Sequence, residues 1–391
     1  MMMNCSLEDI LSKENIRNAL FPVTRNRVFL AHAAVSPLPA PTAEKISAAA
    51  FEASDWSQET ESFFQTITEA RETAAKLLMA KASEIALLGP TALGLNLVAN
   101  GLPWKPGDEV VYYPDDYPTN VYPWKNLEKF GVKTVPLYPE EPGKITLPLV
   151  LKALSSKTKL VALASCHYLS GYLLDYQEMG EALHKRGILF SLDGIQSLGA
   201  SMMDSRYFDF LSADSHKWLL GPLGAGIFYC KESLQDYLSP TLLGAWNIKS
   251  PDFIAQEKIE MERGARRYES GALYALGIVG MQTSMELLLA IGINKIRERI
   301  LFLHQYLWEN LCRVGWKCLS EGFPLERRSG IISAFAPGVD PQGILARLKS
   351  QGVVVSFRMD RNKNWYLRFA PHFYNTEEDI DRVIEILAYK E

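Results

Sequence analysis

The chain has 391 residues, of which 48% are hydrophobic and 22% are charged, and its formal net charge is −4 at pH 7. These values are typical of a globular protein with a large core, and they give no reason to expect nucleic acid or an anionic membrane as a partner. The five cysteines are scattered, no apolar run approaches the ~20 residues that span a bilayer, and the N-terminus lacks the apolar stretch of a signal peptide. We therefore expect a cytoplasmic protein without a metal site.

Strands and helices alternate in the first part of the chain. Residues 59–81 have the apolar spacing of a helix, and a short buried strand at 84–89 precedes a helix at 89–102. The following elements are predicted at 108–113 (strand), near 119–130 (helix), 132–138 and 159–166 (strands), 175–187 (helix), 187–194, 208–214 and 224–230 (strands). This alternation predicts a mostly parallel α/β sheet.

The pattern changes after about residue 270. A long helical block covers 273–315, and we expect it to break near Gly292. Beyond it, the sequence predicts a strand at 329–337, a helix near 341–351, a hairpin-like pair of strands at 352–358 and 365–371, and a helix at 376–389 in which Thr376 and Asp379 resemble an N-cap pair. We predict a large domain over residues 21–290 and a smaller α+β domain over 291–391, with segment 1–20 packed on the smaller one.

Four features fall at the carboxyl ends of the predicted strands, where open α/β sheets bind ligands. Asp193 ends one apolar strand, Lys217 follows the next, and Tyr117 follows an earlier one. GPTALG at 89–94 is a strand-to-helix turn, whose free N–H groups favour a phosphate. Each feature alone has a more ordinary explanation, namely a capping carboxylate, a lysine that reaches solvent, an exposed aromatic side chain and a plain helix cap.

Taken together, the four features meet the requirements of pyridoxal phosphate. Lys217 lies in the mostly apolar stretch SADSHKWLLGPLGAGIFY, where an unpaired ammonium would cost several kcal/mol unless it lost its proton. A neutral lysine can form a Schiff base with the cofactor, and an acid such as Asp193 can pair with the pyridine nitrogen. The helix start would hold the phosphate, and a flat side chain would cover the ring.

Seven segments of the chain carry a resemblance to a known family. They are FLAHAAVSPLP (29–39), GPTALGLNLVANGL (89–102), DDYPTNVYPW (115–124), SLDGIQSLGA (191–200), the lysine stretch, ARRYESGALY (265–274) and LRFAPHFYNTEEDIDRV (367–383). Through them the chain resembles the class V aminotransferase family of fold-type I pyridoxal-phosphate enzymes over nearly its whole length. This family also contains cysteine desulfurases, kynureninase and isopenicillin N epimerase-like proteins, and the lysine segment is most similar to the epimerase-like branch. The resemblance implies a large, mostly parallel seven-stranded sheet domain, a smaller C-terminal α+β domain, and a homodimer with a shared active site.

The resemblance also implies a role for each matching residue. Lys217 would form the Schiff base and move the proton at the substrate Cα, and Asp193 would pair with the pyridine nitrogen. The other implied cofactor contacts are Thr91, Ala92 and Leu93 at the phosphate, Asp214 or Ser215 with His216 beside it, Tyr117 on the ring face, Gln196 at the phenolic oxygen, and Ala272 from the second subunit. Substrate contacts are implied for Arg368, which would grip a carboxylate, and for His32 and Tyr168.

The sequence departs from the family pattern at several positions. Relatives carry a threonine after Gly271 whose hydroxyl reaches the phosphate of the other subunit's cofactor, but here Ala272 offers only its backbone N–H. The region 353–371 contains no cysteine, which disfavours desulfuration through a thiolate of that loop. Arg358 either extends anion recognition to a second acidic group or is a solvated loop charge.

These observations predict an enzyme that acts at the Cα of an amino acid or a derivative of one. We expect an aminotransferase-like reaction first. The alternative is a lyase, of the cysteine lyase or desulfurase kind, or an epimerase of the same fold. A non-catalytic binding protein that keeps the fold is a second alternative. The sequence does not identify the substrate or the pathway.

Overall fold

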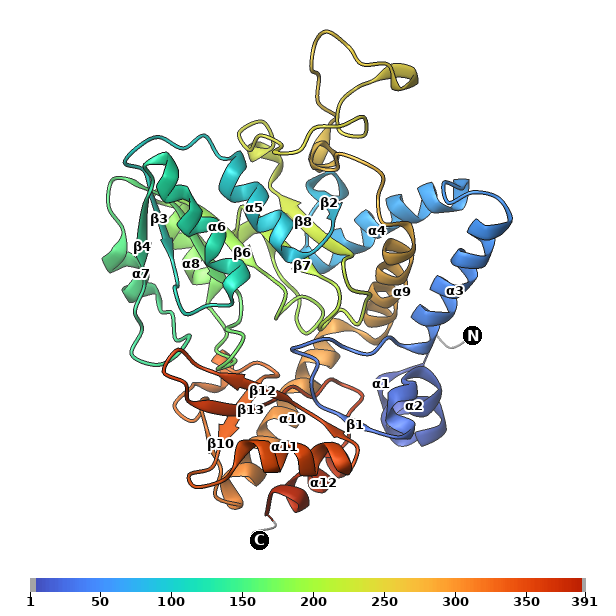
Figure 1. The fold of residues 1–391 in the computed structure, drawn as a ribbon, viewed down its shortest axis with the longest axis vertical. Helices are drawn as coiled ribbons and strands as arrows, with labels where there is room; N and C mark the ends of the chain where they lie inside the picture. Colours follow the sequence, from blue (N-terminus) through green and yellow to red (C-terminus); the bar gives the residue numbers. More distant parts are fainter. Residues whose placement is uncertain (1–4, 389–391) are drawn as a thin grey trace.

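The computed structural model describes residues 5–388, which form two lobes (Figure 1). The larger lobe is built around a seven-stranded sheet, and the smaller lobe lies below it in Figure 1. In sheet order the strands are β2 (Ile85–Leu88), β8 (Gly226–Cys230), β7 (Phe210–Asp214), β6 (Leu189–Asp193), β5 (Thr158–Ala164), β3 (Glu109–Tyr112) and β4 (Lys133–Pro136). Strand β8 is antiparallel to both of its neighbours and every other pair is parallel, which confirms the predicted mostly parallel sheet.

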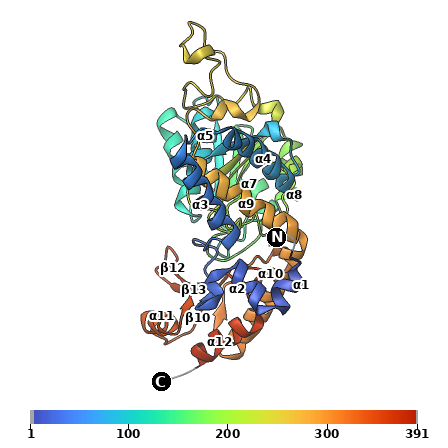
Figure 2. The ribbon, with the colours of Figure 1, turned by 90° about the vertical axis from the view of Figure 1, so that its right-hand side faces the viewer.

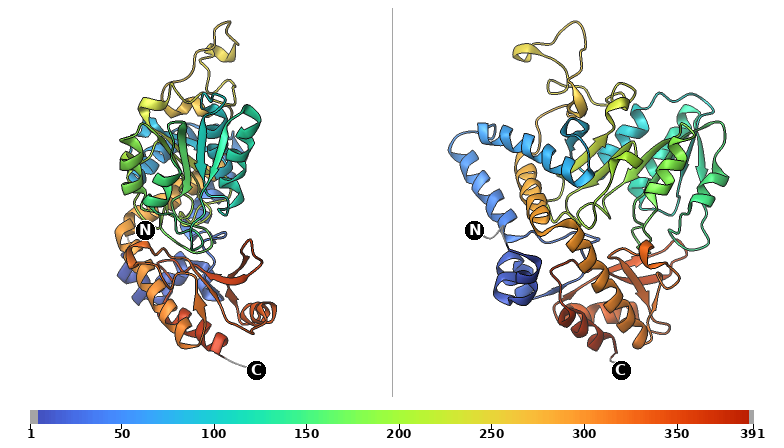
Figure 3. Two further views of the ribbon diagram at one scale, coloured as in Figure 1. Left: turned by 90° about the vertical axis from the view of Figure 1, so that its left-hand side faces the viewer. Right: turned by 180° about the vertical axis from the view of Figure 1, so that it is seen from behind.

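Both faces of the large sheet are covered, because side chains point alternately to opposite faces along each strand. In β5, Leu160 and Ala162 belong to the core on one face, whereas Val161 and Leu163 belong to the core on the other. The first core is closed by α5 (Thr91–Gly101) and α6 (Tyr122–Lys125), and the second by α4 (Glu61–Leu78), α7 (Leu147–Ala153), α8 (Tyr176–His184) and α9 (Ala275–Ile291). Figure 3 shows the sheet between these helical layers.

The helix predicted near 119–130 is not continuous. The structure has a 3₁₀ turn at Pro118–Asn120, the short helix α6 at Tyr122–Lys125 and a second 3₁₀ turn at Asn126–Phe130. The first two of these carry a proline at their first or second position. Proline lacks an N–H and is tolerated only in the first turn of a helix, so each proline starts a new segment and the prediction of one helix is wrong.

Three N-terminal helices add to the predicted elements, namely α1 (Leu7–Ser12), α2 (Glu14–Leu20) and α3 (Ala40–Asp55). The Nη1 atom of Arg17 in α2 lies 3.6 Å from Oδ2 of Asp379. The ring of Phe21 stacks on the ring of Tyr374, with 4.0 Å between the centroids. The described part of segment 1–20 therefore lies against the smaller lobe (Figure 2). Its first four residues lie outside the described residues.

The long helical block breaks where it is predicted to break. Helix α9 ends at Ile291 and α10 (Ile293–Arg313) begins after Gly292, which has φ of 99° and is left-handed, a conformation that favours glycine. The two helices are bent by 81°, and α9 packs on α3 and α4 of the larger lobe. No single helix among residues 5–388 is long and apolar enough to cross a membrane; the bent pair α9–α10 passes that test only when its halves are joined.

The smaller lobe has a four-stranded antiparallel sheet. Its order is β12 (Ser356–Met359), β13 (Trp365–Phe369), β10 (Ile332–Phe335) and β9 (Lys317–Cys318), and it packs with α10, α11 (Pro341–Ser350) and α12 (Glu377–Ala388). Strands β12 and β13 form the predicted hairpin. Thr376 and Asp379 cap α12 reciprocally, since the N–H of each donates to the side chain of the other at 3.2 and 3.3 Å. The division at residues 290 and 291 remains our proposal.

A parallel strand pair joins a segment near the N-terminus to a segment of the smaller lobe. Strand β1 (Val28–Phe29) pairs with β11 (Val353–Val354), although the strands are far apart in the sequence. The segment that follows β1 then leads to the edge of the large sheet, where Ser36 donates to the carbonyl of Lys217 at 2.7 Å. The N-terminal segment therefore links the smaller lobe to the strand ends of the larger one.

Candidate active site

The carboxyl ends of the central strands, the start of α5 and the β12–β13 hairpin surround one cavity of about 280 Å³. Because it is lined from both lobes, it lies where the large sheet faces the small one. Its lining residues are Ala33, Ala34, Val35, Pro90, Thr91, Ala92, Tyr117, Thr119, Tyr168, Asp193, Ile195, Gln196, Asp214, His216, Lys217, Arg358 and Arg368. Most of the residues that the sequence singled out are therefore brought together here.

Lys217 and Asp193 are the central charged pair of this cavity. Asp193 is the last residue of β6, Lys217 follows the neighbouring strand β7, and their side chains are 4% and 8% exposed. Burial lowers the pKa of Lys217 to about 8, the charges of Arg368 and Arg358 act in the same direction, and Asp193 opposes them. Burial raises the pKa of Asp193 to about 6, against the N–H of Ile195 and the charge of Lys217. The lysine can thus lose its proton near neutral pH, while the aspartate is largely ionised there.

Two tyrosines form a flat wall beside the lysine. The Nζ atom of Lys217 lies 5.4 Å from the ring centroid of Tyr117. The rings of Tyr117 and Tyr168 meet edge to face with 5.5 Å between their centroids. Tyr117 is 46% exposed, so its ring borders the open side of the cavity, where a planar ligand could stack.

Helix α5 presents its N-terminus to the cavity. Pro90 is the N-cap and no side chain caps this helix, so its first N–H groups are available to an anion. Thr91 and Ala92 line the cavity, and the hydroxyl of Thr91 accepts a hydrogen bond from the Asp214 N–H at 2.9 Å, which leaves its own proton to donate. The structure does not bring Leu93 to this site, because its side chain is exposed elsewhere and its N–H donates to the carbonyl of Pro90.

Asp214 and Gln196 are held in place by hydrogen bonds inside the chain. Asp214 accepts from the Gly224 N–H at 3.2 Å, and its Oδ1 lies 3.1 Å from Nδ1 of His216, although neither of these two atoms has a hydrogen-bond partner among residues 5–388. The amide of Gln196 accepts from Trp218 Nε1 at 2.9 Å and donates to the Ala33 carbonyl at 3.1 Å. One amide proton of Gln196 remains for a ligand.

Arg368 offers a ready anion-binding fork. It lies on β13 and is 2% exposed, and its Nη1 donates to the carbonyl of Tyr168 at 2.6 Å. Its Nε and Nη2 atoms are buried and have no hydrogen-bond partner among residues 5–388. These two nitrogens form one edge of the guanidinium, which is the edge that binds a carboxylate with two parallel hydrogen bonds. A buried donor pair without a partner is costly, so a bound carboxylate would stabilise it.

Two other residues from the sequence analysis lie away from the cavity. Both ring nitrogens of His32 are engaged, one by the carbonyl of Ala370 at 2.8 Å and the other by the hydroxyl of Tyr374 at 2.6 Å. His32 therefore fastens the N-terminal segment to the smaller lobe and does not line the substrate side. Ala272 is exposed and borders a different cavity together with Leu93, so its contact with a second subunit stays a prediction.

Sequence reasoning missed Asp116. This carboxylate is 7% exposed, does not line the cavity, and accepts from the N–H of Tyr117 at 2.7 Å and from Nδ2 of Asn120 at 3.0 Å. Burial, and then the charge of Asp193, raise the pKa of Asp116 to about 7. It positions the loop that carries Tyr117. The available signal was the pair of consecutive aspartates directly after a strand.

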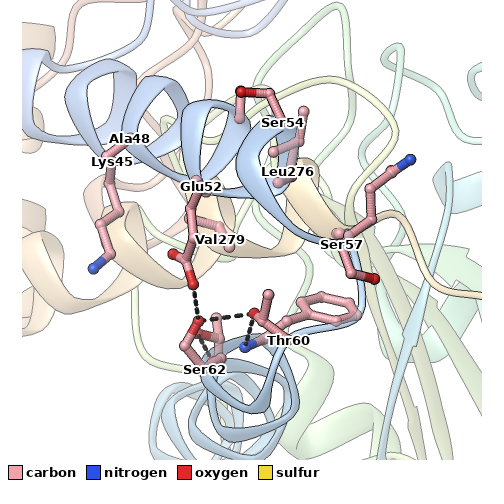
Figure 4. Close-up of a pocket in the computed structure, with 16 residues that line it drawn as sticks. Lys45, Ala48, Glu52, Ser54, Ser57, Thr60, Ser62, Leu276 and Val279 are labelled. Carbon is pink, nitrogen blue, oxygen red and sulfur yellow. Dashed lines mark hydrogen bonds between the residues drawn. The ribbon is translucent and has the colours of Figure 1, made fainter.

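A second cavity, of about 390 Å³, lies between α3, α4 and α9 (Figure 4). Its charged lining residues are Lys45 and Glu52, both exposed, and Ser62 donates to Glu52 at 3.1 Å. None of the residues that line this cavity is a buried titratable pair or a buried donor without a partner, so it is not the candidate active site.

Comparison with known proteins identifies the family. The family model described as aminotransferase class-V matches residues 28–383, and the chain belongs to this family of pyridoxal-phosphate enzymes. It is 26% identical over 337 residues to a probable cysteine desulfurase of Methanothermobacter thermautotrophicus, with 82% of each chain covered. It is 27% identical to the uncharacterized aminotransferase YcbU of Bacillus subtilis, with 95% of this chain and 96% of that protein covered.

Solved structures confirm the fold. The apo structure of a cysteine desulfurase from Thermococcus onnurineus superposes with a TM-score of 0.87 and 23% identity, covering 96% of this chain and 97% of that one. The cystine C–S lyase C-DES, in complex with cysteine persulfide, superposes with a TM-score of 0.84 and 21% identity, covering 94% and 99%. The predicted fold-type I architecture and the cofactor, pyridoxal phosphate, are thus confirmed, whereas the names of the relatives favour the lyase alternative over an aminotransferase.

The residues present fit this cofactor. Lys217 would supply the amine, Asp193 the partner of the ring nitrogen, the uncapped start of α5 the phosphate contacts, and Tyr117 the ring contact. When bound, pyridoxal phosphate supplies an electron sink that stabilises negative charge at the substrate Cα.

The pKa of Lys217 predicts how the apo-protein takes up the cofactor. Only the neutral amine bonds to the aldehyde, so the uptake rate should fall about tenfold per pH unit below the Lys217 pKa of about 8 and level off above it. An ordinary lysine, with a pKa of 10.5, would give a rate that still rises above pH 9. Stopped-flow absorbance measures the rate. In Asp193→Asn the midpoint should move to lower pH, because the carboxylate that favours the charged amine is gone; an unchanged midpoint would contradict the coupling.

Proposed function

We propose that the protein is a pyridoxal-phosphate-dependent lyase that cleaves the carbon–sulfur bond of a sulfur-containing amino acid by β-elimination. The observation that carries the proposal is the arrangement of Lys217 beside the unpartnered fork of Arg368 in a cavity that no cysteine lines. The relatives named cysteine desulfurases support chemistry at sulfur. This proposal replaces the aminotransferase-like reaction that we expected first.

Three side chains of the cavity would each have a separate role in such a reaction. The free edge of Arg368 would bind the substrate carboxylate and so fix the Cα near Lys217. Lys217 would take the proton from Cα, since its pKa of about 8 leaves part of it neutral near pH 7. The ionised Asp193 would pair with the protonated ring nitrogen of the cofactor. With one water, the substrate R–S–CH₂–CH(NH₃⁺)–COO⁻ would give R–SH, pyruvate and ammonium.

The cysteines support elimination over persulfide formation on the protein. None of the five cysteines lines the cavity; three are buried, and burial raises the pKa of Cys166 to about 12. A thiolate nucleophile needs a lowered pKa and access to the substrate, and the buried thiols have neither. Cys312 is exposed, but it lies near the end of α10 in the smaller lobe. The sulfur would therefore leave as a thiol or persulfide in solution.

Product analysis tests this proposal. The holoenzyme is incubated with L-cysteine and with L-cystine without added thiol, and pyruvate, ammonium, sulfide and alanine are measured. We expect pyruvate and ammonium in equal amounts and no alanine. Alanine with a persulfide mark on the protein would show a desulfurase. Keto acid formed once per subunit, with loss of the cofactor's visible absorbance until a second keto acid is added, would show an aminotransferase. Either result would refute the lyase proposal.

A cysteine variant provides the matched control. In Cys312→Ser the rate of pyruvate formation should stay within about twofold of the wild type, because the exposed thiol takes no part in elimination. A loss of more than about tenfold would point to a role for this thiol in sulfur transfer.

A further inference from the structure

We propose, on the basis of the function proposed above, that the substrate is a cysteine whose sulfur carries a carboxylate-bearing substituent. Arg368 would bind the α-carboxylate, and Arg358 would bind the second carboxylate, on the leaving-group side. The argument starts from the β12–β13 hairpin, which carries both arginines.

The register of the hairpin places the two guanidinium groups on one face. Ser356 pairs with Arg368 and Arg358 pairs with Tyr366, so Arg358 and Arg368 are diagonal neighbours across the two strands. Residues in this relation project from the same face, with Cα atoms about 7–8 Å apart. Both arginines line the cavity. The hairpin thus presents two cations to one ligand space, spaced for two anionic groups.

Arg358 has no anionic partner within the part of the chain that the structure describes. Its side-chain hydrogen bond goes to the carbonyl of Phe357 at 2.7 Å, and no carboxylate of residues 5–388 lies within ion-pair distance of it. The neighbouring Arg361, by contrast, pairs with Asp115. The charge of Arg358 reaches the reacting centre, since it lowers the pKa of both Lys217 and Arg368. Two like charges facing one cavity are unfavourable unless an anion lies between or beside them.

The two carboxylates that line the cavity each have a neighbour other than Arg358. Asp214 accepts from the Gly224 N–H and has Oδ1 3.1 Å from Nδ1 of His216, and Asp193 faces Lys217. The phosphate of the cofactor would lie at the start of α5, on the larger lobe, whereas the two arginines come from the smaller lobe. A substrate with a single carboxylate would satisfy Arg368 and leave Arg358 unmatched. A substrate with a second carboxylate beyond the sulfur would satisfy both.

Atoms and electrons balance when the elimination acts on this class of substrate. The Cα proton goes to Lys217, the Cβ–S bond breaks with its electron pair on sulfur, and the sulfur leaves with its carboxylate-bearing substituent. Water then releases pyruvate and ammonium, as for any cysteine derivative. No oxidant or reductant is needed.

A matched pair of substrates tests the inference. S-(carboxymethylthio)-L-cysteine and its amide, S-(carbamoylmethylthio)-L-cysteine, have the same disulfide and nearly the same size, and they differ in one charge. With the holoenzyme we measure kcat/KM for pyruvate release, and the dissociation constant from the change in visible absorbance. We expect the acid to be preferred at least about tenfold by both measures.

Variants of the hairpin assign the preference to Arg358. In Arg358→Gln the ratio of kcat/KM for the acid to that for the amide should fall to within about twofold of one, because any effect of the variant on Lys217 and Arg368 is common to both substrates. Arg358→Lys should retain part of the preference, because it keeps the charge but loses the planar fork. Lys363→Gln, which removes an exposed charge at the turn of the same hairpin, should keep the full preference.

The outcomes separate this inference from the function on which it rests. Equal kcat/KM for acid and amide in the wild type would overturn the second carboxylate site while leaving the lyase intact. An equal loss for both substrates in Arg358→Gln would also overturn it, since Arg358 would then serve the α-carboxylate or the fold. Tighter binding of the acid without pyruvate from either compound would support the Arg358 site and reject the lyase.

Discussion

Replacing Lys217 by alanine is expected to lower product formation at least about 1,000-fold, because this one side chain would supply both the covalent anchor and the base at Cα. The variant should still bind pyridoxal phosphate through the α5 N-terminus, Asp193 and Tyr117. Borohydride reduction followed by peptide mass analysis measures the anchor directly: the wild type should carry the pyridoxyl mark on the Lys217 peptide, and the variant should carry none.

Lys231→Ala is the matched control for this variant. Lys231 follows strand β8, does not line the cavity, and pairs with Asp209 at 3.7 Å. Its loss should leave both the rate and the mark unchanged. A pyridoxyl mark on any peptide other than that of Lys217 in the wild type would refute the assignment of the site.

Asp193→Asn is expected to lower kcat about 100-fold or more. The amide keeps an oxygen that can accept the Ile195 N–H, bonded at 3.1 Å in the wild type, so the turn after β6 should persist. The negative charge is lost, however, and with it the partner that keeps the cofactor's ring nitrogen protonated. Steady-state kinetics and the visible spectrum of the bound cofactor measure the two consequences separately.

Asp116→Asn distinguishes this electrostatic role from a structural one. Asp116 is also a buried carboxylate near the site, but it does not line the cavity, and its contacts are to the loop of Tyr117 and Asn120. We expect it to lower kcat less than about tenfold and to leave the spectrum unchanged. A spectrum of Asp193→Asn identical to that of the wild type would contradict pairing between Asp193 and the ring.

Much of the large sheet is predictable from the sequence, because strands that are buried on both faces are continuous apolar runs between turn residues. Strand β6 ends at Asp193 and β7 at Asp214, within the predicted segments. The sequence pattern gave a wrong prediction where helix-favouring residues and prolines occur in the same segment. The segment after Tyr117 has helical composition, but it forms three short helical segments, the first two of which carry a proline in their first turn.

Some residues of the candidate active site could be predicted from the sequence, and others could not. Lys217, Asp193 and Thr91 follow from their place at strand ends, since parallel strands bring their carboxyl ends to one edge. His32 and Leu93 could not be placed by spacing, because their surroundings depend on contacts between the two lobes and on how the first turn of α5 bonds. The role of Arg358 was also left open, because the face to which its side chain points is set by the register of the β12–β13 hairpin.

The pairing of β1 with β11 has a consequence for how the protein is made. Residues near position 28 leave the ribosome long before their partners near position 353 are translated. The smaller lobe therefore cannot close until β11 has been made, while the sheet of the larger lobe, whose last strand in the chain ends at Cys230, can form beforehand. The ligand space between the lobes closes only then, so the nascent chain should bind pyridoxal phosphate after β11 has paired with β1.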